Sequence, residues 1–502
     1  MDMPAASDTS RFPDATYAQT VLAPLFEGAK AHHVAGFRRI DRAHLVMLAE
    51  TGILPADQAA AIARALAAID AEIDIAALTY TGEVEDYFFL IEKELKGRLG
   101  PDLGGRLHTA RSRNDIDHTL FKLRLKAEID ALSVRLDTLL AALIAKAGRE
   151  TETLIVAYTH GQPAQPTTFA HYLGAMIEVL IRDMERLEAA RAIVDRSPMG
   201  AAAITTTGFP IDRARMAELL GFAAPLQNSY SCIAAVDYIA ATYGALELLF
   251  LHLGRPIQDL QFWTSFEVGQ IYVPNAFVQI SSIMPQKHNP VPIEHMRHLA
   301  SQTLGRARAV LDIMHNTPFT DMNDSEGETQ AFGYEAFASG GRVLDLMAAL
   351  YGAIEIDGAR VADNIRRSCI TVTELADTLV RAAGLSFRQA HEIAAQVARA
   401  VVARGGDLGT DGFAPFREAF AAATGRAPEM DAARFAEIVS PAYFVAVRDR
   451  LGGPAPAAMA AALATYRAAA ADFIARRRRQ ADAEAAASAL LERRFNDVMG
   501  AA

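Results

Sequence analysis

The sequence predicts an all-α fold, and two observations lead to that prediction. Alanine-rich stretches such as residues 60–73, "AAIARALAAIDAEI", and residues 457–473, "AAMAAALATYRAAAADF", are typical of helices. Apolar side chains recur at steps of three and four residues through most of the chain, whereas the strict alternation of half-buried strands is scarce. A length of 502 residues is enough for three domains.

The first elements are a lead-in and an N-terminal helical domain. Residues 1–25 are expected to be disordered, because "MDMPAASDTSRFPDATY" is polar, acidic and rich in turn formers, and it lacks the apolar core of a signal peptide. Residues 26–114 are predicted to be helical. Leu54-Pro55-Ala56-Asp57 has the pattern of a helix start, and Gly100-Pro101 has that of a stop.

A central domain, residues 115–362, is predicted to contain long amphipathic helices. Their expected bounds are 115–148, 169–194, 231–253, 292–314 and 335–356. Helices of this length usually pair in a bundle, and five of them exceed what one small globule can bury. Packing between subunits is therefore expected.

The C-terminal part is predicted to return to shorter helices. Residues 363–475 form a small helical domain that is broken by "ARGGDLGTDGF" and "LGGPAP", and residues 476–502 form a helical tail. The basic run Arg476–Arg479 lies in a helical pattern, so a solvated helix face is favoured over a binding patch.

Composition narrows the class of partner. The net charge of −11 weighs against a nucleic acid or an anionic membrane surface. No apolar stretch of about 18 residues is free of charge, so no membrane span is expected. The two cysteines, Cys232 and Cys369, are far apart and lack metal-ligand spacing, which favours buried thiols in a reducing cytoplasm.

Three polar segments interrupt the helical pattern, and each precedes a long helix. The first is "HTARSRNDID", residues 108–117, which places Arg111, Ser112, Arg113 and Asn114 at a helix N-terminus. Free N–H groups and the helix dipole favour anions there, and the guanidinium fork suits a carboxylate. The alternative is a capped, solvated helix start with Asp115 near the N-cap.

The second segment is "YTHGQPAQPTTFAHYL", residues 158–173, in which Thr159, His160 and Gln165 lie among prolines and glycine. A lone His is more often structural than catalytic, but this one is clustered with Thr and Gln between rigid turns.

The third segment is "SSIMPQKHNP", residues 281–290. It offers hydroxyls, a cation and an amide within ten residues whose backbone two prolines restrict. The three segments together suggest one site assembled at helix ends.

The third segment resembles the signature of the fumarase/aspartase superfamily, and the first two narrow the resemblance to the argininosuccinate lyase branch, which includes the δ-crystallins. The likeness runs from about residue 26 to about residue 470. It implies three mostly helical domains, with the central bundles forming a 20-helix core in a homotetramer. Each active site would then take its segments from three different subunits.

The resemblance also implies the chemistry, an anti β-elimination that splits an N-substituted succinate into fumarate and an amine. Ser281 would be the general base, and Lys287 and Asn289 would hold the carboxylate that takes up charge. His160 would assist at the leaving amine. The expected substrate-binding residues are Arg111, Ser112, Arg113, Asn114, Thr159, Gln165, Ser282 and Met284. No metal or organic cofactor is expected.

The chain departs from the family pattern at several positions. Ile280, Ala110 and Ile116 replace a Gly, a Gly and a Gln, and the N-terminal Trp-Gly-Gly-Arg-Phe is absent. In "PFTDMNDSEGETQ", residues 318–330, Asp321, Glu326 and Thr329 stand where argininosuccinate lyases place the Tyr, Gln and Lys that contact the arginine moiety.

These substitutions bear on the substrate, because a cation that pairs with the arginine carboxylate is lost and two acids appear. Asp321 and Glu326 are accordingly expected to contact the amine half. The amine is expected not to be arginine, and ethylenediamine-N,N′-disuccinate (EDDS) or another aminopolycarboxylate would fit. The alternatives are a genuine argininosuccinate lyase, a lyase with another leaving group, and a non-catalytic crystallin-like scaffold.

Overall fold

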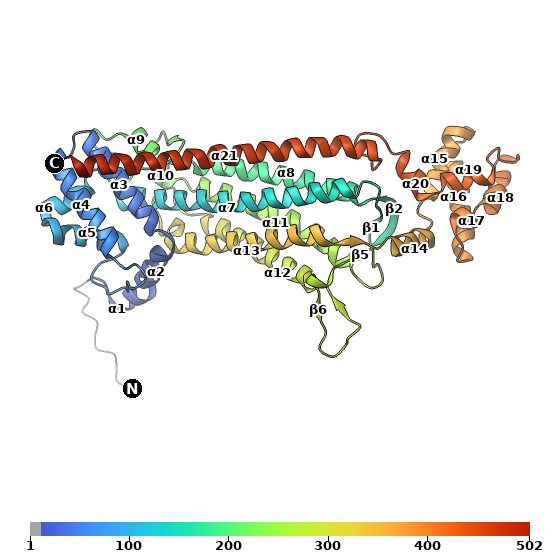
Figure 1. Ribbon diagram of the computed structural model, residues 1–502, viewed down its shortest axis with the longest axis horizontal. Helices are drawn as coiled ribbons and strands as arrows, with labels where there is room; N and C mark the ends of the chain where they lie inside the picture. Colours follow the sequence, from blue (N-terminus) through green and yellow to red (C-terminus); the bar gives the residue numbers. More distant parts are fainter. Residues whose placement is uncertain (1–11, 502) are drawn as a thin grey trace.

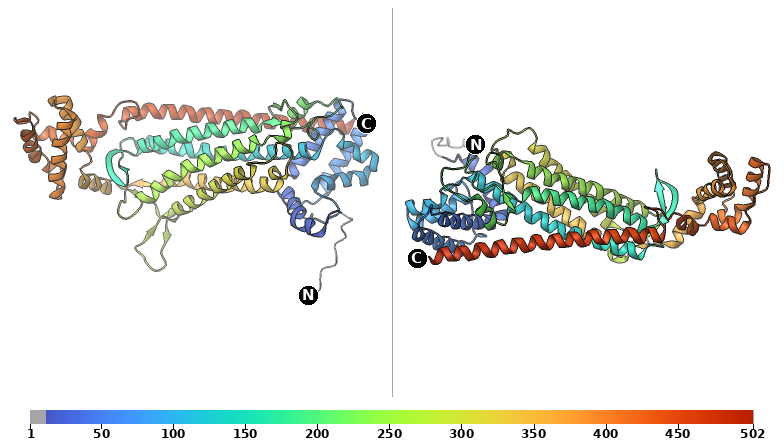
Figure 2. Two further views of the ribbon diagram at one scale, coloured as in Figure 1. Left: turned by 180° about the vertical axis from the view of Figure 1, so that it is seen from behind. Right: turned by 90° about the horizontal axis from the view of Figure 1, so that it is seen from above.

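The structure is a computed structural model that describes residues 12–501. Its long helices lie side by side along the longest axis, with the N-terminal helices at one end and the small C-terminal helices at the other (Figure 1). The last helix runs back along the whole bundle, so that the C-terminus lies beside the N-terminal helices (Figure 2). The expected all-α, multi-domain fold is confirmed.

The N-terminal end consists of short and medium helices. These are α1 Ala15–Tyr17, the π-helix η1 Ala18–Leu22, α2 Ala23–His32, α3 Val34–Glu50, α4 Ala56–Glu72, α5 Tyr87–Leu99, α6 Pro101–Gly105 and the 3₁₀-helix η2 Arg106–His108. Helix α4 starts directly after Pro55, as predicted.

The expected disorder of residues 1–25 is wrong for residues 15–25, which are helical. Asp14 starts this segment, because its side chain accepts hydrogen bonds from the backbone N–H groups of Thr16 and Tyr17. Leu22 and Phe26 are buried, and that burial holds the segment against the rest of the domain. Residues 1–11 lie outside the described part of the chain.

The bundle consists of five long helices. They are α7 Arg113–Arg149, α8 Phe169–Val194, α11 Asp237–Trp263, α12 Val291–Met314 and α13 Gly327–Ala353, with the short α9 Arg213–Leu219, α10 Ser231–Ala234, η3 Asn275–Phe277 and η4 Asn323–Ser325 between them. The predicted bounds of α8 are confirmed. Helix α13 starts eight residues earlier than predicted, and the third predicted helix, 231–253, is broken at Ala235 and Val236 into α10 and α11.

Helix α11 also continues past its predicted end, through Pro256. An internal proline loses a helical hydrogen bond, at a cost of about 3 kcal/mol. The helix packs against both α8 and α12, which supplies the compensating burial. The stretch Ser231–Trp263 is long and apolar enough to cross a membrane by length and composition, but 56% of its most apolar window is buried inside the protein. It is a core helix of the bundle.

Within residues 12–501, four two-stranded sheets connect the helices. They pair β1 Leu154–Thr159 with β2 Gln162–Thr168, β3 Arg196–Ser197 with β4 Ala224–Pro225, β5 Ile271–Tyr272 with β8 Glu355–Ile356, and β6 Gln279–Ile280 with β7 His288–Asn289. All are antiparallel except the β3–β4 pair. The first and last of these sheets carry the second and third polar segments.

The C-terminal helices have a hydrophobic core of their own. They are α14 Gly358–Ser368, α15 Val372–Ala383, α16 Phe387–Ala403, α17 Leu408–Asp411, α18 Phe413–Thr424, α19 Ala432–Ile438 and α20 Pro441–Ala446. Phe416, Phe420 and Phe435 pack together at the centre of this core.

Helix α21, Pro456–Gly500, does not belong to that small core. Its buried Leu463, Phe473 and Phe495 join the main core, and the helix packs along α7, α8, α3 and α4. The expected division between residues 475 and 476 falls inside this helix, and the one between residues 362 and 363 falls inside α14. Composition alone could not predict that α21 packs back against the main bundle, because an alanine-rich helix has the same sequence pattern in either domain.

Candidate active site

The first polar segment is fixed by Asp115, which sits in the first turn of α7. One carboxylate oxygen accepts the backbone N–H of Ser112 at 2.9 Å, and the other accepts those of Gly200 and Ala202, both at 3.0 Å. Asp115 is fully buried, which raises the pKa of its carboxyl group, whereas the three N–H groups act in the opposite direction. It therefore ties the start of α7 to the loop at residues 200–203.

That loop is strained where it meets the segment. Ala202 and Ala203 have positive φ angles of 44° and 77°, which are unfavourable for residues with a Cβ. Gly200 has a φ of 86°, and a Cβ there would lie 2.8 Å from the Ile211 side chain. The helical pattern of the sequence does not predict this loop. Its only signal in the sequence is the run of small residues after Pro198.

Asn114 joins three parts of the chain. Its Oδ1 accepts the Asp115 N–H at 2.8 Å, and its Nδ2 donates to the carbonyl oxygen of Ala203 at 2.9 Å and to Oδ2 of Asp321 at 3.3 Å. Asp321 belongs to the divergent segment at residues 318–330. The structure thus brings the first polar segment and the segment expected to contact the amine into direct contact within one chain.

Around this contact lies a cavity of about 380 Å³. Helices α1 to α3 contribute Tyr17, Val21, Leu22, Leu25, Ala29, His33 and Phe37 to its wall. Its remaining lining residues are polar for the most part: Glu85, Asp86, Tyr87, Ser112, Arg113, Asn114, Asp117, Phe121, Asp321, Asn323, Glu326, Gly327 and Glu328. Among the described residues 12–501, the lining therefore has six carboxyl side chains and a single Lys or Arg, namely Arg113.

Arg113 is already paired inside this cavity. Its guanidinium lies 2.8 Å from Glu85 and 2.8 Å from Asp86, and it stacks over the ring of Phe89 at 5.2 Å. These two carboxylates raise the pKa of the guanidinium against the effect of burial. The acidic stretch at residues 83–86 could not be predicted as part of the site, because nothing local in the sequence links it to a helix that starts at residue 113.

The other carboxyl groups of the cavity wall are not neutralised by Arg113, because its guanidinium is paired with Glu85 and Asp86. Burial is the main cause that raises the pKa of Glu326 to about 7, and the neighbouring charge of Asp321 adds to it. Burial, followed by the charge of Glu326, raises the pKa of Asp117 well above its ordinary value. The carboxyl group of Asp117 has no hydrogen-bond or ion-pair partner among residues 12–501. The cavity is thus suited to a cation, which would let these groups ionise.

Arg111 does not line this cavity, contrary to its expected role in substrate binding. Its guanidinium is buried in an ion pair with Asp41 of α3, at 2.6 Å, and lies over the ring of Phe88 at 5.5 Å. The sequence could not separate Arg111 from Arg113, because both precede the helix and the partner of Arg111 is 70 residues away.

The second polar segment is a β-hairpin at the other end of α7 and α8. Thr159 and Gln162 are paired, and His160 and Gly161 form the two-residue turn with φ angles of 53° and 72°. Two positive φ angles are typical of the type I′ turn that fits a twisted hairpin. Thr159, His160 and Gln165 are exposed. The sequence did not predict these strands, because β2 contains two prolines and proline is unusual inside a strand.

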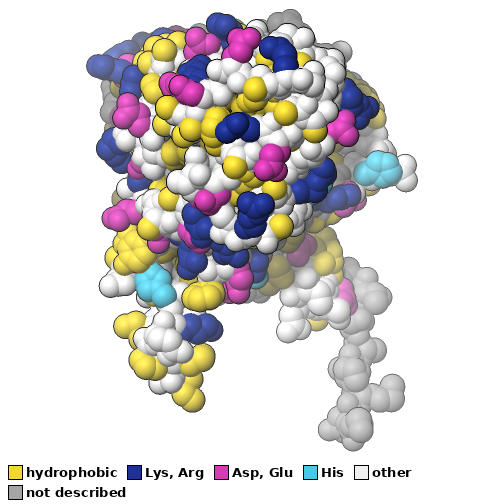
Figure 3. Space-filling view, turned by 90° about the vertical axis from the view of Figure 1, so that its right-hand side faces the viewer, with side chains coloured by type: hydrophobic (Ala, Val, Ile, Leu, Met, Phe, Trp, Pro, Cys, Tyr) yellow, Lys and Arg dark blue, Asp and Glu magenta, His cyan; other side chains and the backbone are white. Residues whose placement is uncertain are grey.

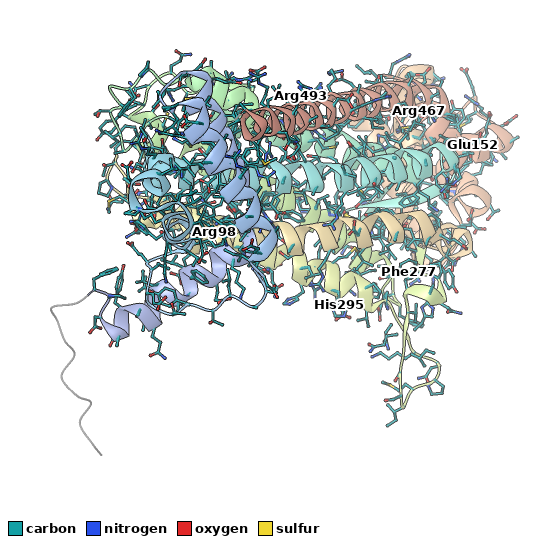
Figure 4. All side chains as sticks on the ribbon, turned by 60° about the vertical axis from the view of Figure 1, so that its left-hand side comes forward. Arg98, Glu152, Phe277, His295, Arg467 and Arg493 are labelled. Atoms are coloured by element: carbon teal, nitrogen blue, oxygen red, sulfur yellow. The ribbon has the colours of Figure 1, made fainter. Side chains whose placement is uncertain are left out.

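The third polar segment is the tip of a hairpin that stands off the bundle (Figures 1 and 2). Phe277 and His295 mark its base in Figure 4. Asn289 pairs with Gln279 across the strands, and its side chain donates to the carbonyl oxygen of Gln279 at 3.1 Å. Lys287 and Ser282 are exposed, and Met284 is 40% exposed.

Ser281 lies at the start of this tip. Its hydroxyl oxygen accepts the backbone N–H of Met284 at 3.0 Å and that of Ile283 at 3.5 Å. Two N–H groups directed at one oxygen would stabilise negative charge on it.

The three segments lie apart within one chain. Arg98, in the N-terminal helices, and Glu152, just before β1, lie toward opposite ends of the long-helix bundle in Figure 4, and the third segment projects between them. The first segment and residues 321–328 share a cavity, whereas the second segment packs near α14 and α20. Among residues 12–501, no group of three or more His, Cys, Asp or Glu side chains is arranged to hold a metal ion.

Comparison with known proteins agrees with this architecture. A family model described as "Lyase" matches residues 39–305, and one described as "Argininosuccinate lyase C-terminal" matches residues 369–446. "Argininosuccinate lyase 2" of Agrobacterium fabrum is 70% identical over 498 residues, covering 99% of both chains. The chain belongs to the argininosuccinate lyase family.

Two further proteins resemble the chain at lower identity. "Argininosuccinate lyase 1" of Shouchella clausii is 37% identical over 380 residues, covering 76% of both chains. A crystal structure of EDDS lyase in complex with formate has a TM-score of 0.84 and is 28% identical, covering 97% of this chain and 99% of its own. The protein is a carbon–nitrogen lyase of the argininosuccinate lyase type.

Proposed function

We propose that the protein splits L-argininosuccinate reversibly into fumarate and L-arginine. The observation that carries this proposal is the 70% identity, over 99% of the chain, with a relative named argininosuccinate lyase. The expected non-arginine amine has weaker support, because the EDDS lyase is only 28% identical. The guanidinium group of the substrate is a permanent cation, and it is complementary to a cavity wall with six carboxyl groups.

A diamine is the second candidate for the amine half. It is favoured by the charge of the cavity, because Arg113, the one Lys or Arg that the described part of the chain places in the lining, is already paired with Glu85 and Asp86. A substrate carboxylate next to Asp321 and Glu326 would lack a cation within this chain and would be costly to bury. An aminopolycarboxylate whose amine half is cationic at this position would avoid that cost.

The chemistry requires a proton to leave a carbon next to a carboxylate, so that two negative charges collect on that carboxylate. Ser281 is proposed as the base. As an oxyanion it would be stabilised by the N–H groups of Met284 and Ile283, which already point at its oxygen. Lys287 and Asn289 would hold the carboxylate that takes up charge. Closure of the hairpin over the substrate would exclude water.

The remaining roles follow the same family pattern. Ser112, Arg113, Asn114, Thr159 and Gln165 are proposed to position the succinyl half, together with Ser282 and Met284 of the hairpin. His160, at the turn of the β1–β2 hairpin, is proposed to assist the leaving amine. Asp321 and Glu326 are proposed to contact the amine. Arg111 is not included, because its side chain is taken up by Asp41.

We propose that these segments meet in a homotetramer, with each site built by three subunits. The separation of the segments within one chain supports this, and so do exposed apolar side chains on the elements that would meet. Ile280 and Ile283 of the hairpin are 83% and 82% exposed, and hydrophobic side chains gather on the projecting hairpin in Figure 3. Leu251 of α11 and Phe332 of α13 are also exposed on the bundle.

The proposed reaction is tested by mixing the enzyme with fumarate and one amine at a time and following fumarate absorbance. Consumption with L-arginine, and fumarate release from argininosuccinate, are expected. If only a diamine is consumed, the second candidate is correct. If neither amine is consumed and argininosuccinate is not split, the proposed function is wrong.

The shared site is tested by mixing two inactive variants. Ser281→Ala and Asn114→Ala should each be inactive as homotetramers. After the subunits are exchanged at equal amounts, about one quarter of the sites should contain neither substitution, because the two segments come from different subunits. No recovered activity would contradict the three-subunit site.

A cytoplasmic location remains part of the proposal. The two cysteines, Cys232 and Cys369, are both buried free thiols, which fits a reducing compartment.

A further inference from the structure

The loop between α12 and η4 carries Asp321 into the cavity, and it has few attachments. Its internal hydrogen bonds are short-range, such as Thr320 N–H to the carbonyl oxygen of Pro318 at 2.9 Å. Asn316, near its start, has a positive φ angle of 65°. From Pro318 to Asp321, the hydrogen bonds to distant described residues are two: Asn114 to Asp321, and Tyr230 to Phe319.

Tyr230 holds the loop in two ways. Its hydroxyl donates a 3.2 Å hydrogen bond to the backbone carbonyl oxygen of Phe319. Its ring lies almost parallel to the ring of Phe319, at 26° and with 6.0 Å between the centroids. Both side chains are exposed, at 42% and 66%, so the contact is not a by-product of core packing.

Tyr230 is itself held by a rigid turn. The Asn228 side chain accepts the N–H groups of Tyr230 at 2.9 Å and Ser231 at 3.2 Å, and the Ser231 hydroxyl donates to the carbonyl oxygen of Asn228 at 2.8 Å. The next two residues, Cys232 and Ile233, are buried in a small apolar cluster beneath the turn. The turn at residues 228–231 therefore fixes the position of Tyr230, and Tyr230 in turn holds the loop through Phe319.

We propose that Tyr230 is a positioning residue that sets the place of the Asp321 carboxylate and thereby selects the amine. The inference rests on the proposed function, in which Asp321 contacts the amine half. Asp321 lies two residues after Phe319, so a shift of the Phe319 backbone is passed directly to it. The Asn114–Asp321 bond, at 3.3 Å, is long and is not sufficient to fix the carboxylate alone.

Two variants separate the parts of this contact. Tyr230→Phe keeps the ring and loses the hydroxyl, and Tyr230→Ala loses both. The KM for the amine in the addition reaction should rise about twofold to fivefold in the first and about tenfold in the second. The KM for fumarate should stay within twofold of the parent in both. Tyr466→Phe is the matched control, because it loses a hydroxyl bond to Glu178 far from the cavity.

Hydrogen–deuterium exchange measures the anchor without using activity. In Tyr230→Ala, exchange should become faster in residues 317–326 and stay unchanged in the hairpin at residues 281–290. Equal rises in both KM values, or unchanged exchange and an unchanged amine KM, would overturn the proposal. If the parent consumes no amine, the proposed function fails. Unchanged exchange would then still overturn the anchor, and faster exchange would still support it.

Discussion

Asn114 donates a 3.3 Å hydrogen bond to the Asp321 carboxylate and so joins two residues that are 207 positions apart. One belongs to the segment proposed to bind the succinyl half, and the other to the segment proposed to bind the amine. Because both line one cavity, the bond that is broken would lie between them. The contact therefore marks where the succinyl half of the substrate would end and where the amine half would begin.

Asp321→Asn should weaken binding of the amine and leave binding of the succinyl half unchanged. The substitution removes a negative charge from a wall that is proposed to hold a cation, and the KM for the amine should rise about tenfold. The KM for fumarate should not change. Initial rates of fumarate consumption at varied amine and fumarate concentrations measure both constants.

Asp324→Asn is the matched control for this substitution. Asp324 is exposed, lies three residues further along the same segment, and does not line the cavity. It should leave both KM values unchanged. A rise in the amine KM of the same size in both variants would show that the acids act only through overall charge.

Binding of a permanent cation should become tighter as the pH rises through about 7. The folded protein raises the pKa of Glu326 from 4.5 to about 7, so the side chain is largely protonated below that pH and ionised above it. Asp86, Asp117 and Asp321 face the same space, and Arg113 opposes them. His33, whose pKa is lowered to about 3 mainly by burial, stays neutral throughout. L-Arginine keeps its guanidinium charge over this range.

A rise in pH should have the opposite effect on the contribution of Glu326 to the stability of the fold. Since the folded state holds the Glu326 proton more tightly than the unfolded state, the contribution of this group to the free energy of unfolding falls as pH rises from 4.5 to about 7. Calorimetry of arginine binding in two buffers of different ionisation heat measures the proton released. Glu326→Gln should reduce that release and flatten the pH dependence. An unchanged release in this variant would count against Glu326.

The sequence predicted the bundle better than it predicted the wall of the cavity, for a physical reason. The bounds of α8 follow from local pattern, since Thr168 caps the helix and its apolar residues repeat along one face. Glu85 lies just before α5, Asp117 lies in α7 and Glu326 lies just before α13. They line one cavity only through tertiary packing, which no local pattern predicts. The hairpin around His160 was missed because its turn is set by two positive φ angles.

Ser281→Ala should lower kcat by about 100-fold to 10,000-fold, the usual loss when a general base is removed. The substitution removes the hydroxyl oxygen that accepts two backbone N–H groups. Fumarate release from the substrate measures the loss, and size-exclusion chromatography checks that the assembly is unchanged. Ser301→Ala, on the exposed face of α12, is the control. Full activity in Ser281→Ala would remove the proposed base.

Arg111→Leu should lower stability rather than catalysis. The substitution leaves the Asp41 carboxylate buried without its cation, and breaking such a pair costs about 3–5 kcal/mol of unfolding free energy. The deficit should shrink at low pH, because burial already raises the pKa of Asp41 and loss of Arg111 raises it further. Urea unfolding measures this. The double variant with Asp41→Leu should recover most of the loss.

The exposed pair of Lys93 and Glu83 provides the comparison for this buried one. Lys93→Ala should lower the free energy of unfolding far less than Arg111→Leu does, because solvent screens both charges. If Arg111→Leu instead left unfolding unchanged and raised the KM for argininosuccinate, Arg111 would be a substrate ligand after all. The Arg111 guanidinium is buried, binds Asp41 at 2.6 Å and does not line the cavity around Asn114 and Asp321, so the loss of stability is the expected outcome.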